Sequence, residues 1–261
     1  MLRSAKELMK YTLQFQPGAG QAGQSGPMKI VDYIFDDFEW LIRYVVVQAG
    51  ARNYVLSTMA FGAPVMQQEV LPVQIDPSVL AGSPDIDFNQ PFGRSQEDML
   101  SRHYGWPRYW ENLDVPTTLP GDLTAVPLVD MEMEKEPMLP VTGSDSELGS
   151  SPDTKYLHRA SEIWGATVTT RNGNAGKLDD FIILDENWDL PYLVVDTGGL
   201  LNSKRVLLAP SWVMQSDYEK KELFVDLDPS VIQKSPEFTT NSALPAEYWD
   251  EVTDYYGKED E

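Results

Sequence analysis

One 22-residue stretch occurs twice in this chain and decides its fold. Residues 177–198 read KLDDFIILDENWDLPYLVVDTG, and residues 29–50 read KIVDYIFDDFEWLIRYVVVQAG. Nine of the 22 paired positions are identical at a constant offset of 148 residues. Chance pairing would give roughly one or two identities, because most residue types are used at a few per cent. The chain therefore contains an internal duplication.

Further matches extend the duplication to both sides. Residues 2–8 read LRSAKEL and recur as LHRASEI at 157–163, while DPSVL at 76–80 returns as DPSVI at 228–232. We interpret the Asp-Pro-Ser block as a turn, with the serine capping the turn or a short helix after it, rather than as a binding site.

The two halves differ most at one connection. The offset falls from 155 to 148 between the first two repeated blocks, so the first half carries seven extra residues there, within 16–27. The second half has Arg171-Asn172-Gly173-Asn174 at this place, and an Asn-Gly turn predicts a β-hairpin. We expect the extra residues in the hairpin tip, since loop-closure entropy grows only logarithmically with length.

Within each half the apolar clusters are short, rich in Val, Ile, Tyr and Phe, and separated by turn residues. In the second half they predict strands over 166–170, 177–184, 192–196, 205–209 and 223–227. Such short strands favour a small barrel or sandwich. Helical signals are confined to 95–102 and 244–255.

The region between the halves has a different composition. Residues 115–153 contain six prolines and interleaved acidic residues, which indicates an extended acidic linker. The sequence thus predicts a first repeat with a helical extension over 1–114, the linker, and a second repeat with a C-terminal helical extension over 154–261.

Charge and composition exclude several classes of function. Acidic residues outnumber basic ones 41 to 20, for a net charge of −21 and a pI near 4.3, so binding to nucleic acid or anionic membrane surfaces is disfavoured. The chain has no cysteine, which removes thiolate chemistry and Cys-based metal sites. Residues 1–15 lack the apolar run of roughly 7–15 residues that a signal peptide needs, and no run approaches the ~20 residues of a membrane span. We expect a cytoplasmic protein without membrane insertion.

The second half resembles the PRC-barrel family. The resemblance rests on Gly176-Lys177-Leu178-Asp179-Asp180, Asp185, Trp188, Tyr192-Leu193-Val194-Val195-Asp196-Thr197-Gly198-Gly199, Val206-Leu207-Leu208-Ala209-Pro210 and Trp212-Val213. It covers 157–236 well and 2–84 more weakly, where Gly50-Ala51 replaces the Gly-Gly pair. The resemblance implies a mainly β fold of two tandem small antiparallel β-barrels, each followed by a short helical segment. It also implies binding to proteins or regulation of larger assemblies, with no catalytic residues to carry over.

Two motifs imitate ligand sites. Gly173-Asn174-Ala175-Gly176-Lys177 looks like a phosphate loop, but Arg171 and Leu178 stand where that loop needs glycine and Ser or Thr. Residues 185–189 imitate the start of a calcium loop, but Leu190 occupies its required glycine position. We interpret the first as a hairpin turn and the second as an acidic hairpin tip, with weak cation binding as the alternative.

No catalytic constellation is visible. The two histidines, His103 and His158, have no metal-ligand neighbour at helical spacing. The carboxylate pairs Asp36-Asp37 and Asp179-Asp180 are adjacent, and adjacent side chains on a strand point to opposite faces. We therefore predict a protein that is not an enzyme and carries no cofactor or metal.

Aromatic residues outside the strands are candidate interface residues, because Trp and Tyr are enriched at interfaces. They are Trp106, Tyr109, Trp110, Trp249, Tyr255 and Tyr256. The alternative is that they pack back onto the barrels.

Two functions follow from the sequence. The first is a non-enzymatic interaction or regulatory scaffold whose acidic surface meets a protein partner, favouring a basic one. The second is a regulatory protein that binds a small ligand or divalent cation through acidic loops. The duplication is compatible with pairing of the two repeats within one chain and with a homodimer.

Overall fold

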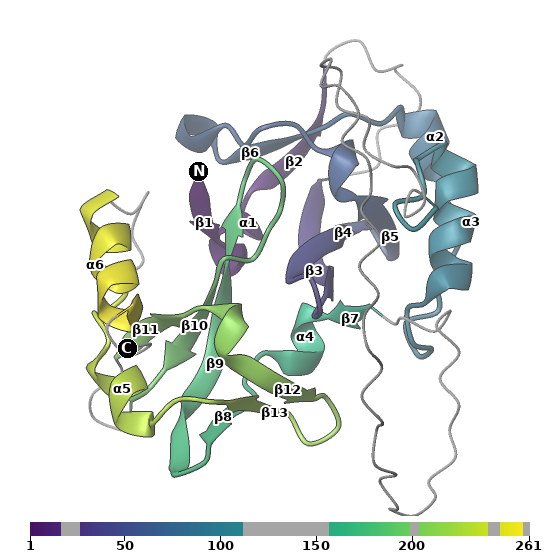
Figure 1. Ribbon diagram of the computed structural model, residues 1–261. Coiled ribbons are helices and arrows are strands. Elements are labelled where there is room, and N and C mark those ends of the chain that lie inside the picture. Colours follow the sequence, from purple (N-terminus) through teal and green to yellow (C-terminus); the bar gives the residue numbers. More distant parts are fainter. Residues whose placement is uncertain (17–26, 112–156, 199–203, 240–245, 258–261) are drawn as a thin grey trace, which may run out of the picture.

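The computed structural model describes residues 1–16, 27–111, 157–198, 204–239 and 246–257, and is mainly β (Figure 1). The elements of the first half are β1 (Leu2–Ser4), α1 (Ala5–Leu8), β2 (Thr12–Phe15), β3 (Met28–Asp36), β4 (Leu41–Ala49), β5 (Arg52–Ser57), η1 (Thr58–Ala60), η2 (Met66–Gln68), β6 (Val70–Val73), α2 (Pro77–Ala81) and α3 (Arg94–Tyr104). Those of the second half are β7 (His158–Arg159), α4 (Ala160–Ile163), β8 (Thr167–Thr170), β9 (Gly173–Leu184), β10 (Tyr192–Asp196), β11 (Arg205–Leu208), η4 (Pro210–Trp212), β12 (Val213–Asp217), β13 (Glu222–Val225), α5 (Pro229–Lys234) and α6 (Ala246–Gly257).

Each half supplies all but one strand of one sheet, and the two sheets share a strand order. The first runs β5-β4-β3-β2-β6 and the second runs β11-β10-β9-β8-β13-β12. The duplicated stretch forms the β3–β4 hairpin in one sheet and the β9–β10 hairpin in the other. The internal repeat of the sequence is thus a repeat of topology.

The sheets are mixed, and the expectation of purely antiparallel sheets is wrong in this respect. Strand β2 pairs in parallel with β6, and β8 pairs in parallel with β13. In the second half, β9, β10, β11, η4 and β12 all lie between β8 and β13 in the chain. Strands β8 and β13 are therefore not joined by a hairpin, and they pair in parallel. Within the described ranges, the pairing of each sheet runs along an open path that does not close into a barrel.

The two halves exchange their first strands. Strand β1 pairs with β9 of the second sheet, with Leu2 opposite Leu184, and β7 pairs with β3 of the first sheet, with Phe35 opposite His158. Residues 2–8, which the sequence assigns to the first repeat, therefore lie against the second sheet. Figure 1 shows β1 beside β9 and β7 beside β3.

An aspartate at the same place in each half fixes this exchange. The buried Asp180 accepts a hydrogen bond from the Lys6 N–H (3.1 Å) and one from the Ser4 hydroxyl, at the start of α1. Its counterpart Asp32 accepts from the Ser161 N–H (3.1 Å) at the start of α4. A carboxylate that satisfies the unpaired N–H groups of a helix start is a stabilising cap.

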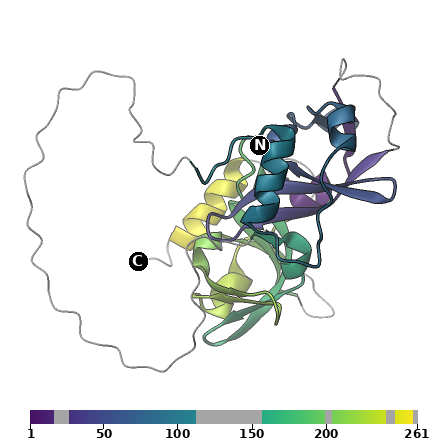
Figure 2. The ribbon, with the colours of Figure 1, turned by 90° about the vertical axis from the view of Figure 1, so that its right-hand side faces the viewer.

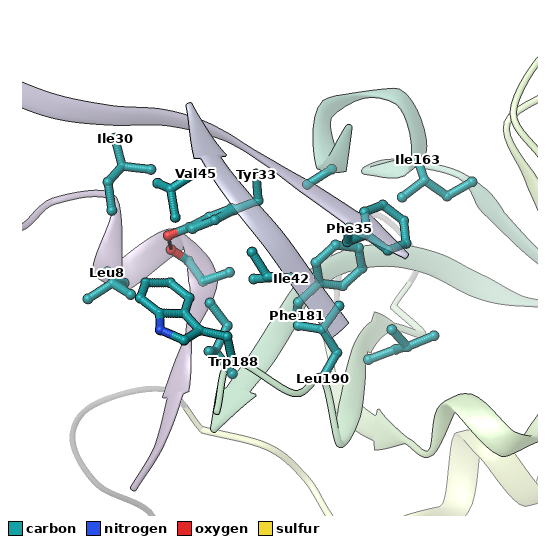
Figure 3. Packing of buried hydrophobic residues seen from close by; sticks show 14 of the residues in the cluster. Leu8, Ile30, Tyr33, Phe35, Ile42, Val45, Ile163, Phe181, Trp188 and Leu190 are labelled. Carbon is teal, nitrogen blue, oxygen red and sulfur yellow. Dashed lines mark hydrogen bonds between the residues drawn. The ribbon is translucent and has the colours of Figure 1, made fainter. Parts of the chain in front are cut away.

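One hydrophobic core extends through both halves. Phe35 of β3 and Phe181 of β9 lie edge to face with their ring centroids 5.2 Å apart (Figure 3). Both are fully buried, as are Ile42 and Ile163, in a single cluster that draws on both sheets. Burial of such a side chain contributes about 1.5–3 kcal/mol, so this shared cluster holds the halves together.

Two helices cover the outer faces of the sheets. Leu100 of α3 packs on β3, β4 and β5, and Val252 of α6 packs on β9, β10 and β11. Figures 1 and 2 show α3 outside the first sheet and α6 outside the second. The helical signal at 95–102 lies within α3, and the signal at 244–255 coincides with α6 from Ala246 onward, while residues 244 and 245 lie outside the described residues.

The remaining local predictions have clear outcomes. The Asn-Gly turn forms the predicted β8–β9 hairpin, with Thr170 opposite Gly173. The Asp-Pro-Ser blocks begin α2 and α5 as predicted. The capping residue is the aspartate, however, and not the serine. The Asp76 carboxylate accepts a hydrogen bond from the Ser78 N–H at 2.7 Å, in the first turn of α2. The linker 115–153 lies outside the described residues. In the described part, every helix is too short or too polar to cross a membrane.

Candidate functional site

Two tryptophans mark the line along which the halves meet. Trp40 and Trp188 end the β3–β4 and β9–β10 turns, and both have positive φ angles, 50° and 65°. The Trp188 carbonyl accepts a hydrogen bond from the Ile42 N–H (3.0 Å), and the Trp40 carbonyl accepts one from the Leu190 N–H (2.8 Å). Each turn thus accepts a hydrogen bond from a residue that follows the other turn. We use the word seam for each of the two places where a turn of one half meets the other half. We call the seam at Trp40 the first seam and that at Trp188 the second seam.

A groove of about 390 Å³ runs along the first seam. It is lined by Asp37, Phe38, Trp40, Pro210, Ser211, Val213, Met214, Gln215 and Ser216. Residues of the β3–β4 turn form one side, and residues of η4 and β12 form the other. The volume lies within the range of pockets that bind small molecules or side chains.

Two large apolar side chains are exposed on opposite sides of this groove. Phe38 is 82% exposed and Met214 is 64% exposed, the two highest values among the large hydrophobic residues described. Water contact at a phenylalanine and a methionine leaves unrealised the free energy that burial would supply. Exposed apolar side chains that adjoin a groove are typical of an interaction site.

The second seam provides an internal comparison. Glu186 stands at the position equivalent to Phe38, and it forms an ion pair with the amino terminus of Met1. In the first half Phe61 pairs with Val73, and in the second half Val213 pairs with Val225. Both pairs are related by an offset of 152 residues, and the same offset makes Gly62 the residue equivalent to Met214. The chain therefore builds the same junction without Phe38 or Met214, so the fold does not require these apolar side chains.

A polar wall of Asp37, Tyr218 and His158 adjoins the groove, which Asp37 also lines. The Tyr218 hydroxyl donates to Asp37 Oδ2 (2.7 Å), and the His158 ring stacks on the Tyr218 ring at 3.6 Å between centroids. Burial raises the pKa of Tyr218, and the neighbouring Asp37 carboxylate raises it further. Burial lowers the pKa of His158, although Asp37, Glu162 and Asp36 oppose that shift. The wall therefore holds a protonated tyrosine and a neutral histidine near pH 7.

The second seam has a different polar pair at this place. Arg3 donates through Nε to both carboxylate oxygens of Asp185 at 2.7 Å, and their side chains are only 10% and 11% exposed. Asp185 would be the first ligand of the calcium-like loop, and Arg3 already neutralises it. Among the residues that the structure describes, no group of three acidic, His or Cys side chains is arranged to hold a metal ion.

A larger groove of about 650 Å³ is lined by both rings of the His158–Tyr218 stack. Two of its cationic side chains have partners within the chain: Arg159 donates to Glu162 at 3.0 Å, and Lys221 donates to the Ser161 carbonyl at 3.3 Å.

The predicted interface aromatics of the first half pack on that half. Trp106 stacks on Tyr104 at 4.1 Å between centroids. The Tyr109 hydroxyl donates to Glu97 (2.8 Å). Trp110 lies 4.2 Å from the Arg94 guanidinium. All three predicted residues are half-buried.

Those of the second half do the same where they are described. The Tyr255 hydroxyl donates to the Val231 carbonyl and the Tyr256 hydroxyl to the Leu207 carbonyl, both at 2.8 Å. Tyr256 is buried. Trp249 belongs to α6, but its side chain lies outside the described residues. The two most exposed of the large hydrophobic side chains described, Phe38 and Met214, are not among the residues that the sequence analysis named.

Comparison with known proteins does not place the chain in a family. The chain matches no protein-family model. No curated protein matches it significantly either. The aligned repeats nevertheless contain a signal for the first seam, because Phe38 aligns with Glu186 in otherwise similar turns.

Proposed function

We propose that this protein is a non-enzymatic interaction scaffold whose first seam binds a protein partner. We also propose that each half is a PRC-barrel-like domain. The resemblance to that family implies binding to proteins or regulation of larger assemblies. The repeated strand order of the two sheets shows that the two halves resemble each other.

The observation that carries the proposal is the contrast between the seams. Phe38 and Met214 are exposed at one seam, and Glu186 and Gly62 take their places at the other. Since the same junction forms without them, their exposure is not a requirement of folding. Association with another protein would bury both side chains and recover the hydrophobic free energy.

Charge indicates the kind of partner. The chain carries a net charge of −21, and the groove lining contains one charged side chain, the Asp37 carboxylate, and no cation. A basic partner would be attracted at long range, and that attraction would weaken as salt screens it.

The test is quantitative capture of proteins from a lysate of the native host. Wild-type protein, Phe38→Glu and the matched control Met59→Gln are each immobilised and washed at low and then moderate salt. Phe38→Glu introduces the residue of the second seam, and Met59 is another exposed methionine (56%) outside the groove.

We expect one stoichiometric basic partner that wild type and Met59→Gln retain, that Phe38→Glu loses, and that salt releases. A partner retained equally by all three proteins would place binding elsewhere. No stoichiometric partner on the wild-type protein would contradict the scaffold proposal itself.

A further inference from the structure

Strand β12 forms an open edge of the second sheet. It stands at the end of the order β11-β10-β9-β8-β13-β12, and in the described part of the chain it pairs with β13 alone. The outer side of an edge strand presents backbone N–H and C=O groups that another strand can pair with. Four of its five residues are among those that line the groove of the first seam.

The groove follows this edge and does not lie on one face of the sheet. Gln215 and Ser216 both line it, and successive side chains of a strand point to opposite faces. The lining includes no residue of β13, the strand paired with β12, so we infer that the hollow lies toward the unpaired side of β12. The pairing of β12 with β13 shifts register between Val213 and Gln215, so Met214 is bulged out of the ladder. This bulge accounts for the exposure of Met214.

We propose that an extended, cationic segment of a partner protein adds to β12 as a further strand. Its main chain pairs with the outer edge of β12, and one apolar side chain lies between Phe38 and Met214. A lysine or arginine beside that apolar residue lies near Asp37, whose carboxylate is 28% exposed. Backbone pairing supplies affinity and the alternate side chains supply specificity, as in other cases of strand addition. This inference rests on the scaffold function proposed above and names the form of the partner.

Charge distinguishes this occupant from two others. Residues 112–156 of the chain itself contain nine acidic and two basic residues, so they would bring like charge to the acidic seam. A second copy of the chain would bring a further net charge of −21. A basic segment from another protein is the occupant that the electrostatics favour.

The test begins with a phage-displayed library of random 12-residue peptides selected on the full-length protein at low salt. We expect enriched sequences in which apolar residues alternate with Lys or Arg. Each enriched peptide is then synthesised in two forms, one unmodified and one N-methylated at alternate residues. Strand addition requires the peptide N–H groups, so the methylated form should bind at least about tenfold more weakly when the methylated residues face β12.

Two further measurements locate the peptide. Phe38→Glu and Met214→Gln should each weaken binding by about tenfold, as loss of roughly 1.4 kcal/mol implies, while Met59→Gln should bind like wild type. Hydrogen exchange should show new protection of the β12 amides when the unmodified peptide binds.

The outcomes separate this inference from the scaffold proposal. Failure to enrich any peptide, equal binding of the methylated and unmodified forms, or enrichment of acidic peptides would overturn strand addition. The scaffold proposal would survive each of these results if the lysate experiment still gave a partner that Phe38→Glu loses. If that partner is absent as well, both proposals fail.

Discussion

The carbonyl oxygens of Trp40 and Trp188 each accept a hydrogen bond from the opposite half of the chain, although the two residues are 148 positions apart. Each tryptophan adopts a positive φ to make this contact. Together with the exchange of β1 and β7, these bonds make the two repeats one interlocked body. Stability of either half is therefore expected to depend on residues of the other.

Asp180 provides the first test of this dependence. In Asp180→Ala the Lys6 N–H, the Phe181 N–H and the Ser4 hydroxyl all lose a buried acceptor. We expect a loss of about 3 kcal/mol in the free energy of unfolding, measured by urea denaturation, because each unsatisfied buried donor costs about 1–3 kcal/mol. Asp180→Asn keeps one acceptor oxygen and should lose only about 1 kcal/mol. Equal losses in the two variants would show that the hydrogen bonds are not what matters.

The same residue makes stability depend on pH. Burial raises the pKa of Asp180 from 3.8 to about 6, although its hydrogen bonds oppose the shift. Between these two values the folded state keeps a proton that the unfolded state releases, so the contribution of Asp180 falls as pH rises from about 4 to 6. The free energies of unfolding of wild type and Asp180→Asn should be measured from pH 4 to 7. We expect the value for wild type to fall relative to that of the variant as pH rises. A wild type that gains relative to the variant would contradict the raised pKa.

His158 should act in the opposite direction. Burial lowers its pKa below the ordinary 6.5 despite the nearby carboxylates of Asp37, Glu162 and Asp36. Below pH 6.5 His158 binds a proton more readily in the unfolded chain than in the folded state. The contribution of His158 to the free energy of unfolding is therefore lost as pH falls. In thermal melts from pH 8 to 5, wild type should lose stability relative to His158→Gln at the acidic end. A relative gain for wild type would mean that the carboxylates dominate over burial.

Gly176 tests the structural interpretation of the Gly-Asn-Ala-Gly-Lys motif. Its φ is +144°, and a β-carbon there would lie 2.9 Å from the Asp196 carbonyl carbon, so backbone must shift to admit alanine. Gly50 also has a positive φ, +61°, but a β-carbon at Gly50 would meet nothing within 4 Å. We expect Gly176→Ala to destabilise by about 3 kcal/mol and Gly50→Ala by about 1 kcal/mol, in urea denaturation. Similar losses would mean that only the dihedral angle matters.

Much of the secondary structure was predictable because local pattern determines it. The apolar clusters at 192–196 and 205–209 locate β10 and β11 to within one residue. The Asn-Gly pair determines the β8–β9 turn. By contrast, β1 and β7 have three and two residues, too few for any period to appear, and β12 is polar enough to read as a loop.

The sequence did not single out Phe38 and Met214, and the reason is physical. The Trp and Tyr residues were selected by residue type, but how far each is buried depends on its contacts: Trp110 with Arg94, Tyr109 with Glu97 and Tyr256 with the Leu207 carbonyl. Phe38 and Met214 are separated by 176 positions, and only the meeting of the halves places them on one groove. Residue type predicts what a side chain is able to do at an interface, while exposure decides whether it is available.

The duplication, the mainly β character, the acidic charge and the lack of cysteine can all be read from the linear order of residues, because repetition, period and charge are properties of that order. The exchange of the first strands, the parallel pair in each sheet and the placing of Phe38 and Met214 on one groove became visible only in the tertiary structure. Strand pairing and burial depend on which surfaces meet across more than a hundred residues, and local pattern does not contain that information.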